Sequence, residues 1–137
     1  METRTTAGLS QQAKEILGKK TFAHLATLMP DGSPQVTPVW VDDEGDRIVV
    51  NTAEGRAKPQ NLRNDPRVAL SATDPDNPYE AVIVRGRVSE MTHEGADDHI
   101  DAMAKKYLDR DRYPFRQSGE QRVKVYIEPE VVKGANE

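Results

Sequence analysis

One segment of the sequence combines the groups that proteins use to bind a phosphate or another anion. In Asn51-Thr52-Ala53-Glu54-Gly55-Arg56-Ala57-Lys58, an apolar strand ends at a hydroxyl, passes a glycine and enters a short helix beside two cations. The amides of a helix N-terminus attract negative charge, Thr52 can donate its hydroxyl, and Arg56 and Lys58 can form charge-assisted hydrogen bonds with phosphate oxygens. We interpret the segment as a candidate anion site. Cations that only face water at a helix start are the alternative interpretation.

A second segment, Gln35-Val36-Thr37-Pro38-Val39-Trp40, is typical of a strand beside which a ligand can lie. Proline has no amide to donate to a strand ladder, so Pro38 predicts a sheet edge, a bulge or a place where the backbone opens towards a ligand. Gln35 and Thr37 would share one face, and the chain's only tryptophan would lie on the other. A planar aromatic cofactor along this strand could receive backbone hydrogen bonds beside its ring. An ordinary edge strand fits the pattern equally.

Other catalytic chemistry finds little support in the residue types. The chain has no cysteine, which excludes disulfides, thiolate nucleophiles, zinc–thiolate sites and iron–sulfur clusters. No G-x-S-x-G motif is present, and His24 alternates onto an apolar strand face, as a structural histidine would. His93 and His99 are six residues apart and would point in different directions around a helix. We therefore predict no catalytic side chain and no metal site.

Length and charge indicate one soluble domain. The 137 residues carry 19 Lys plus Arg against 23 Asp plus Glu, a formal charge of -4. We expect a single domain over residues 1–137, with residues 1–8 as a flexible N-terminal tail. Net acidity argues against a nucleic-acid partner, because affinity for the phosphate backbone comes mostly from Lys and Arg. No apolar run approaches the ~20 residues of a membrane-spanning helix, so we expect a cytoplasmic protein without a membrane partner.

Two or three short helices are predicted. The first begins after Ser10 as its N-cap and ends at Gly18. The second follows the anion segment, tolerates Pro59 in its first turn and stops before residues 65–66. The third runs from a cap at Thr92 to about residue 108. Its apolar stripe is predicted to consist of Ile100, Met103, Ala104, Tyr107 and Leu108, with Lys105 and Lys106 among the side chains that face water.

The rest of the chain is predicted to form strands separated by turn residues. Three strands are expected at residues 22–28, 35–41 and 47–52 to form a meander, with residues 42–46 as a polar turn. Three further strands are expected at residues 67–73, 79–90 and 122–128. Gly86 marks a bulge or bend, and Val123, Val125 and Ile127 point inward while Tyr126 points outward. The pattern indicates a small, partly open antiparallel barrel.

Several motifs, in order, resemble the pyridoxamine-phosphate-oxidase-like split β-barrel family. Ala26-Thr27-Leu28 and Asp31-Gly32-Ser33-Pro34-Gln35-Val36-Thr37-Pro38-Val39-Trp40 resemble the start of that family. The later motifs are similar to its branch that uses the deazaflavin coenzyme F420; they are Arg56-Ala57-Lys58, residues 61–70, 74–79, 84–88 and 104–108, and Asp111-Arg112-Tyr113-Pro114. The likeness covers residues 9 to 132. Pro59 departs from it, because relatives usually carry an ordinary helix former after the lysine.

The resemblance implies a homodimer of mainly β, six-stranded antiparallel split barrels, with two cofactor clefts at the subunit interface. It implies that Thr52, Arg56 and Lys58 hold the cofactor phosphate and that Asn61 supports the phosphate turn. Residues 35–38 would run beside the ring system, and Tyr79 and Glu80 would approach from the other subunit. The implied cofactor-binding set is Gln35, Val36, Thr37, Pro38, Asn51, Thr52, Arg56, Ala57, Lys58, Asn61, Tyr79 and Glu80.

The activity implied by the resemblance is that of an F420-dependent oxidoreductase. Such an enzyme transfers a hydride from reduced deazaflavin to an unsaturated or otherwise electron-poor small molecule. An oxidoreductase of the same fold that binds FMN is the nearest alternative. A non-catalytic protein that binds flavin, deazaflavin or a tetrapyrrole is another. Arg63 and Arg67 would favour the anionic tail of deazaflavin, or they are solvated cations.

Overall fold

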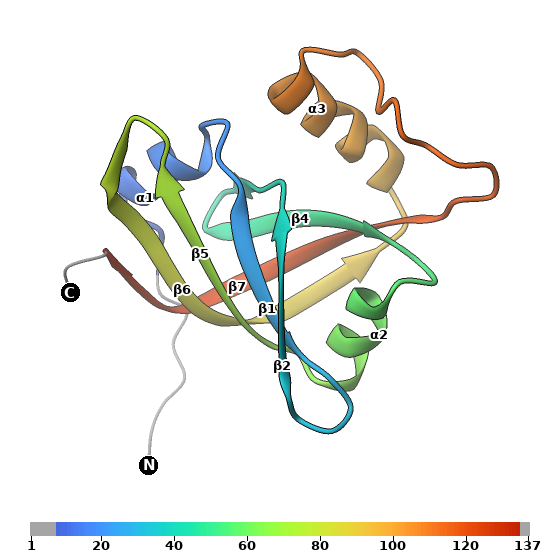
Figure 1. Ribbon diagram of the computed structural model, residues 1–137, viewed down its shortest axis with the longest axis horizontal. Helices are drawn as coiled ribbons and strands as arrows, with labels where there is room; N and C mark the ends of the chain where they lie inside the picture. Colours follow the sequence, from blue (N-terminus) through green and yellow to red (C-terminus); the bar gives the residue numbers. More distant parts are fainter. Residues whose placement is uncertain (1–7, 135–137) are drawn as a thin grey trace.

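The computed structural model describes residues 8–134 as one curled antiparallel sheet with three helices (Figure 1). Seven strands follow the spatial order β2-β1-β5-β6-β7-β4-β3. Their bounds are β1 Ala23–Leu28, β2 Pro34–Val39, β3 Asp42–Glu44, β4 Arg47–Ala53, β5 Arg67–Asp74, β6 Asn77–Thr92 and β7 Arg122–Gly134. The expected flexible tail lies outside the described residues except for Gly8. The fold is mainly β, as predicted, and its two edges do not pair, so the barrel is open.

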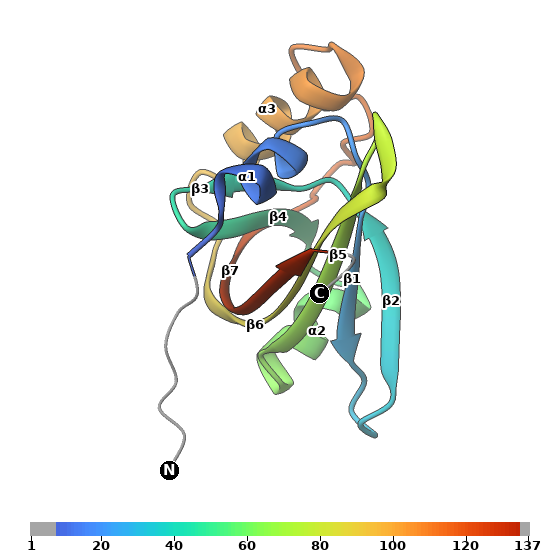
Figure 2. The same cartoon turned by 90° about the vertical axis from the view of Figure 1, so that its left-hand side faces the viewer.

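The three helices are α1 (Gln11–Leu17), α2 (Ala57–Asn64) and α3 (Ala96–Leu108). Ser10 caps α1 as predicted, because its side chain accepts a hydrogen bond from the Ala13 amide, 3.1 Å away. The predicted cap of α3 at Thr92 is wrong, since Thr92 is still paired in β6. Gly95 starts α3 instead, at a φ of 75° that favours glycine. α3 and α2 lie towards opposite ends of the curled sheet (Figures 1 and 2).

The predicted meander is wrong, because β4 does not pair with β2. Residues 42–44, expected within a polar turn, form the short strand β3, with Asp42 opposite Val49 of β4. β4 then pairs with β7 on its other side, and β2 is left as the opposite edge of the sheet. This adds a seventh strand to the six expected. The edge predicted from Pro38 is confirmed.

The long strand β6 bends the sheet. Its pairing with β7 shifts register between Arg85 and Gly86, which confirms the predicted bulge. A Cβ on Gly86 would collide with the Glu128 carbonyl oxygen, so only glycine permits this close approach. β6 pairs with β5 over residues 77–87 and with β7 over residues 82–92, and the sheet therefore curls around an interior (Figure 2).

The burial of side chains in β7 agrees with most of the alternation predicted for that strand. Val123, Val125 and Ile127 are buried, as expected. Tyr126 was expected to point to solvent but is buried, and the Arg47 guanidinium carbon lies 3.9 Å from its ring centroid. A long basic side chain can thus cover a ring on the outer side of a sheet.

Two residues of α3 also differ from the prediction. Leu108 is exposed, because the helix ends there. Lys106 does not face water: its Nζ donates hydrogen bonds of 2.6 Å to the carbonyl oxygens of Leu17 and Val41. The four-carbon stem of lysine allows its charge to reach these backbone groups from the helix. None of the helices within residues 8–134 has the length and apolar character required to cross a membrane.

Candidate functional site

The predicted anion segment forms the turn between β4 and α2. β4 ends at Ala53, Gly55 reverses the chain at a φ of 88°, and Arg56 is the N-cap of α2. The Arg56 side chain makes no capping hydrogen bond, so it does not satisfy the first amides of the helix. Pro59 lies in the first turn and is buried, and its missing amide removes no hydrogen bond inside the helix. The local structure therefore presents amide donors beside Arg56 and Lys58.

Two threonine hydroxyls near these elements are buried without a partner. The hydroxyls of Thr52, at the end of β4, and of Thr37, in β2, make no hydrogen bond within the described residues. Thr52 is 1% exposed. A buried hydroxyl without a partner destabilises a protein by about 1–3 kcal/mol, so such groups are typical of sites that complete their hydrogen bonds with a ligand. Both residues belong to the predicted cofactor-binding set, and both have the donors that such a ligand requires.

Three cations, Arg56, Lys58 and Arg122, lie close together beside the turn between β4 and α2. Burial lowers the pKa of Lys58, and the positive charges of Arg56 and Arg122 lower it further. The nearby Glu120 carboxylate lies 3.1 Å from Nη1 of Arg122 and 4.0 Å from Nη2 of Arg56. One carboxylate among three cations leaves an excess of positive charge, which a bound anion would relieve.

Arg122 is the residue of this cluster that the sequence did not indicate. Its side chain is 3% exposed, and its Nε donates to Oδ1 of Asn51 at 2.8 Å. The Asn51 amide nitrogen in turn donates to the Ala96 carbonyl oxygen and lies 3.0 Å from Nδ1 of His99. Burial and the charge of Lys124 lower the pKa of His99 to about 4, so its neutral ring can accept this hydrogen bond. Asn51, predicted to bind cofactor, thus orients Arg122.

Asn61 joins the two segments singled out in the sequence. It is 2% exposed, and its Nδ2 lies 3.3 Å from both Oε1 of Gln35 and Oγ1 of Thr27. α2 is therefore held against β1 and β2. The turn between β4 and α2, residues 53–58, which we call the anion turn, lies beside the strand that carries Gln35 and Thr37. Ala57, the first residue of α2, is exposed at this turn.

An aromatic cleft opens next to the cations. It has a volume of about 190 Å³, and Trp40, Tyr113, Phe115, Arg56 and Arg122 are among its lining residues. The Tyr113 ring contacts those of Trp40 and Phe115 edge-on, at centroid distances of 5.9 and 5.6 Å. Of these three aromatic residues, the strand pattern singled out only Trp40. Tyr113 lies within one of the motifs of the family resemblance, whereas nothing in the local pattern marks Phe115 or Arg122.

Comparisons with known proteins identify the family and the fold. The family model described as pyridoxamine 5'-phosphate oxidase matches residues 9–135. The chain belongs to this family. An F420 reductase of known structure is 29% identical and superimposes with a TM-score of 0.78, covering 88% of this chain and 94% of that one.

Two further solved structures show the same fold. A conserved hypothetical protein from Mycobacterium tuberculosis is 23% identical, with a TM-score of 0.72, and covers 98% of this chain and 89% of its own. An FAD-binding protein from Mesorhizobium loti is 24% identical, with a TM-score of 0.67, and covers 94% of this chain and 96% of its own.

Several predicted residues of this family member lie away from the anion turn. Tyr79 is 83% exposed near the start of β6, and the adjacent Glu80 accepts a hydrogen bond from Gln12 of α1. The β5–β6 hairpin and α2 lie on opposite sides of the molecule (Figure 1). The single chain therefore does not bring Tyr79 and Glu80 to Arg56.

The outer face of β1 and β2 is exposed. Val36 is 63% exposed and Pro38 is exposed beside it. The interpretation of His24 as a structural histidine on an apolar strand face is wrong, because His24 is exposed opposite Pro38. Alternation placed His24 correctly on the face of Phe22, but no element of the described chain covers that face.

Arg63 and Arg67, considered for an anionic tail, both have carboxylate partners. Arg63 binds Glu54 with two hydrogen bonds of 2.7 and 2.6 Å, and with His93 it lowers the pKa of Glu54 to about 2. Nη2 of Arg67 lies 2.7 Å from Oδ2 of Asp65. An anionic cofactor tail that bound Arg63 or Arg67 would have to compete with the Glu54 and Asp65 carboxylates.

Proposed function

We propose that the protein is an oxidoreductase that binds the deazaflavin coenzyme F420 and reduces an unsaturated or electron-poor small molecule. The observation that carries the proposal is the cluster of Arg56, Lys58 and Arg122 at the turn that follows Thr52, whose buried hydroxyl has no partner within the described residues. Reduced deazaflavin, when bound, supplies a hydride to such a substrate. The likeness to an F420 reductase, over most of both chains, supports deazaflavin in preference to FMN.

The phosphate of the cofactor is the group that fits the anion turn. Thr52 would donate its hydroxyl, the amides at Ala57 and Lys58 would point at the phosphate, and the Arg56 and Lys58 side chains would supply charged hydrogen bonds. Asn61 would hold this turn in place through its contacts with β1 and β2. These groups bind and orient the cofactor and need no acid–base role of their own.

The edge strand β2 would lie beside the ring system. Its backbone between Gln35 and Pro38, including Val36, has no neighbour on one side, and the hydroxyl of Thr37 is available as a donor. An edge strand can donate and accept hydrogen bonds along a planar ligand without breaking any pair within the sheet.

We further propose a cytoplasmic homodimer in which Tyr79 and Glu80 reach the cofactor of the other subunit. Support comes from the exposed apolar side chains of Phe22, Val36 and Ile83 on the outer sheet face. A hollow of about 430 Å³ lies on the same sheet, lined in part by Ala26 and Arg85. Exposed apolar surface of this kind is typical of protein interfaces.

Parallel titration of the apoprotein with deazaflavin and with FMN, followed by cofactor fluorescence, tests the proposal. Lys58→Ala should weaken deazaflavin binding by about 10- to 100-fold, because a charged hydrogen bond contributes about 1.5–3 kcal/mol. Lys20→Ala is the matched control, since Lys20 is exposed and lies before β1. Light scattering on the same samples measures whether the protein is a dimer.

Each outcome has a definite meaning. Unchanged deazaflavin affinity in a folded Lys58→Ala variant removes Lys58 from the site. Tighter binding of FMN than of deazaflavin replaces our proposal with a flavin enzyme. Binding of neither cofactor by the wild-type protein refutes the proposed function.

A further inference from the structure

The aromatic cleft carries a feature that the cofactor phosphate does not explain. Trp40, Tyr113 and Phe115 surround one side of it, and the ring of Phe115 is 62% exposed. The Trp40 ring is fixed from behind by Tyr107, which stacks on it at 5.1 Å with an interplanar angle of 5°. The three rings form an apolar wall against which the face of a planar ligand can pack.

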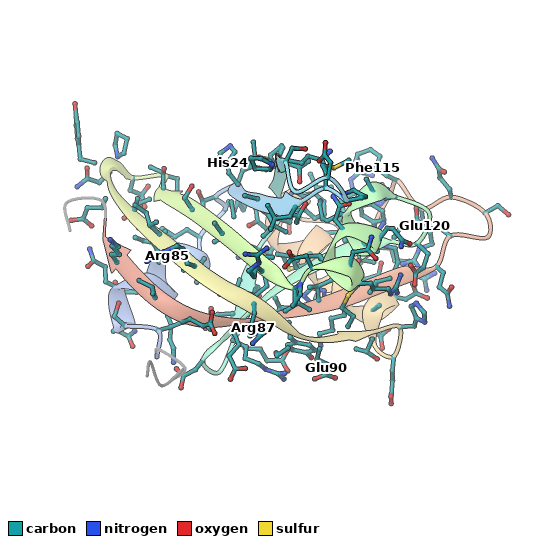
Figure 3. The ribbon with its side chains drawn as sticks, turned by 90° about the horizontal axis from the view of Figure 1, so that it is seen from below. His24, Arg85, Arg87, Glu90, Phe115 and Glu120 are labelled. Carbon is teal, nitrogen blue, oxygen red and sulfur yellow. The ribbon has the colours of Figure 1, made fainter. Side chains whose placement is uncertain are left out.

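The loop that supplies two of these rings is held in place. The Tyr113 amide donates a 2.9 Å hydrogen bond to Oδ1 of Asp101 in α3, and Arg116 binds the same oxygen at 2.8 Å. Phe115 and Glu120 lie in the connection between α3 and β7, whereas Arg85 lies towards the opposite end of the molecule (Figure 3). The cleft is therefore separate from the hollow on the outer sheet face.

Arg122 supplies a directed charge within this aromatic surface. Its guanidinium carbon lies 5.1 Å from the Tyr113 ring centroid, and Asn51 and Glu120 hold its Nε and Nη1. No hydrogen bond from the described part of the chain involves its Nη2. A buried arginine oriented by two partners, with one nitrogen left over, is suited to bind a carboxylate.

We propose that this cleft is a substrate subsite for planar, conjugated molecules that carry a carboxylate. The carboxylate binds Arg122, and the conjugated ring lies against Tyr113 and Phe115. Arg56 lines the same cleft, so a ring held there lies next to the turn assigned to the cofactor phosphate. The term substrate rests on the proposed function, whereas the binding of a planar carboxylate does not.

The experiment compares 2-naphthoate with 2-naphthamide by isothermal titration calorimetry, on the apoprotein and on the protein saturated with oxidised deazaflavin. The two probes have the same ring and differ in charge. We expect naphthoate to bind at least about tenfold more tightly than the amide, because only the acid forms a charged hydrogen bond with Arg122. Arg122→Gln should abolish this ratio.

Two variants separate the contributions of charge and ring. Arg110→Gln is the matched control, since Arg110 is exposed in the same connection and does not line the cleft; it should keep the ratio. Phe115→Ala should weaken both probes by a similar factor and leave their ratio unchanged. Because Phe115 is exposed, this variant should fold even if Arg122→Gln does not.

Equal affinities of the two probes for the wild-type protein would overturn the inference. Displacement of naphthoate by deazaflavin would also overturn it, since the cleft would then belong to the cofactor. If naphthoate discriminates while deazaflavin fails to bind, the carboxylate subsite stands and the proposed function fails. If deazaflavin binds and the probes do not differ, the proposed function stands alone.

Discussion

Replacement of Thr52 by valine should make the protein more stable and its cofactor binding weaker. Thr52 is 1% exposed at the end of β4, and its hydroxyl has no hydrogen-bond partner within the described residues. Valine has nearly the same shape, so Thr52→Val removes the polar group and leaves the packing unchanged.

The gain in stability follows from the unsatisfied hydroxyl. Burying a hydroxyl without a hydrogen bond is unfavourable by about 1–3 kcal/mol, and the methyl group that replaces it is favourably buried. We therefore expect the free energy of unfolding of the apoprotein to rise by about 1 kcal/mol. Most substitutions at buried positions lower that free energy, so the sign of the change is the informative result.

The loss in binding follows from the same atom. A hydrogen bond from a hydroxyl to a charged phosphate contributes about 1.5–3 kcal/mol, which corresponds to a loss of about 10- to 100-fold in deazaflavin affinity. Urea unfolding measures the first effect, and a fluorescence titration measures the second. The slope of the unfolding transition should not change, since the fold is unaltered.

Thr21→Val is the matched control. Thr21 is 6% exposed, and its hydroxyl donates a 2.6 Å hydrogen bond to the Thr73 carbonyl oxygen. This variant should lose about 1–2 kcal/mol of stability and keep its cofactor affinity. If Thr52→Val destabilises the protein as much as Thr21→Val does, the Thr52 hydroxyl is satisfied in the apoprotein and our reasoning about the site is wrong.

Three further predictions concern the stability of the fold. Burial keeps the pKa of His99 near 4 against an ordinary 6.5, so its contribution to stability is complete above pH 6.5 and is lost as the pH falls towards 4. Between pH 7 and pH 5 this loss amounts to about 2 kcal/mol, and urea titrations should show it in the wild type but not in His99→Gln. Gly86→Ala should lower the free energy of unfolding by about 1–3 kcal/mol or prevent folding, because the alanine Cβ would collide with the Glu128 carbonyl oxygen. Equal stability of the variant and the wild type in urea would contradict this close approach. Lys106→Met should lower the free energy of unfolding by about 1–3 kcal/mol, because it removes two hydrogen bonds to backbone carbonyls. Lys105→Met, on the exposed face of α3, is the control and should change thermal stability little. Equal effects of the two substitutions would show that the hydrogen bonds of Lys106 contribute nothing to stability.

Local chemistry made much of this fold predictable. The Ser10 cap, the buried Pro59 in a first turn and the bend at Gly86 each depend on the backbone needs of one residue and its near neighbours. The anion turn belongs to the same class, because its hydroxyl, glycine and cations lie within seven residues, from Thr52 to Lys58. Such short segments have few ways to fold, so their sequence restricts them strongly.

Alternation in a strand is predictable, but the element that covers each face is not. His24 and Tyr126 show this limit: each was placed on the correct side of its strand relative to its neighbours, yet His24 is exposed and Tyr126 is buried. A period of two residues separates the faces without saying which face meets other parts of the chain. The sequence also did not predict that β4 pairs with β7 instead of β2, because alternation within a strand does not say which strand lies beside it.

The aromatic cleft and its arginine depend on tertiary structure. Asn51 and Arg122 are 71 residues apart, and neither the spacing nor the residue types near Arg122 reveal that one holds the other. The sequence by itself determined the turn between β4 and α2, the edge strand β2 and the β class of the fold. Only tertiary packing decided that Arg122 is buried beside Tyr113 and next to Arg56. Contacts between distant residues depend on strand order and on the curl of the sheet, and these arise from the summed pairing and burial of the whole chain.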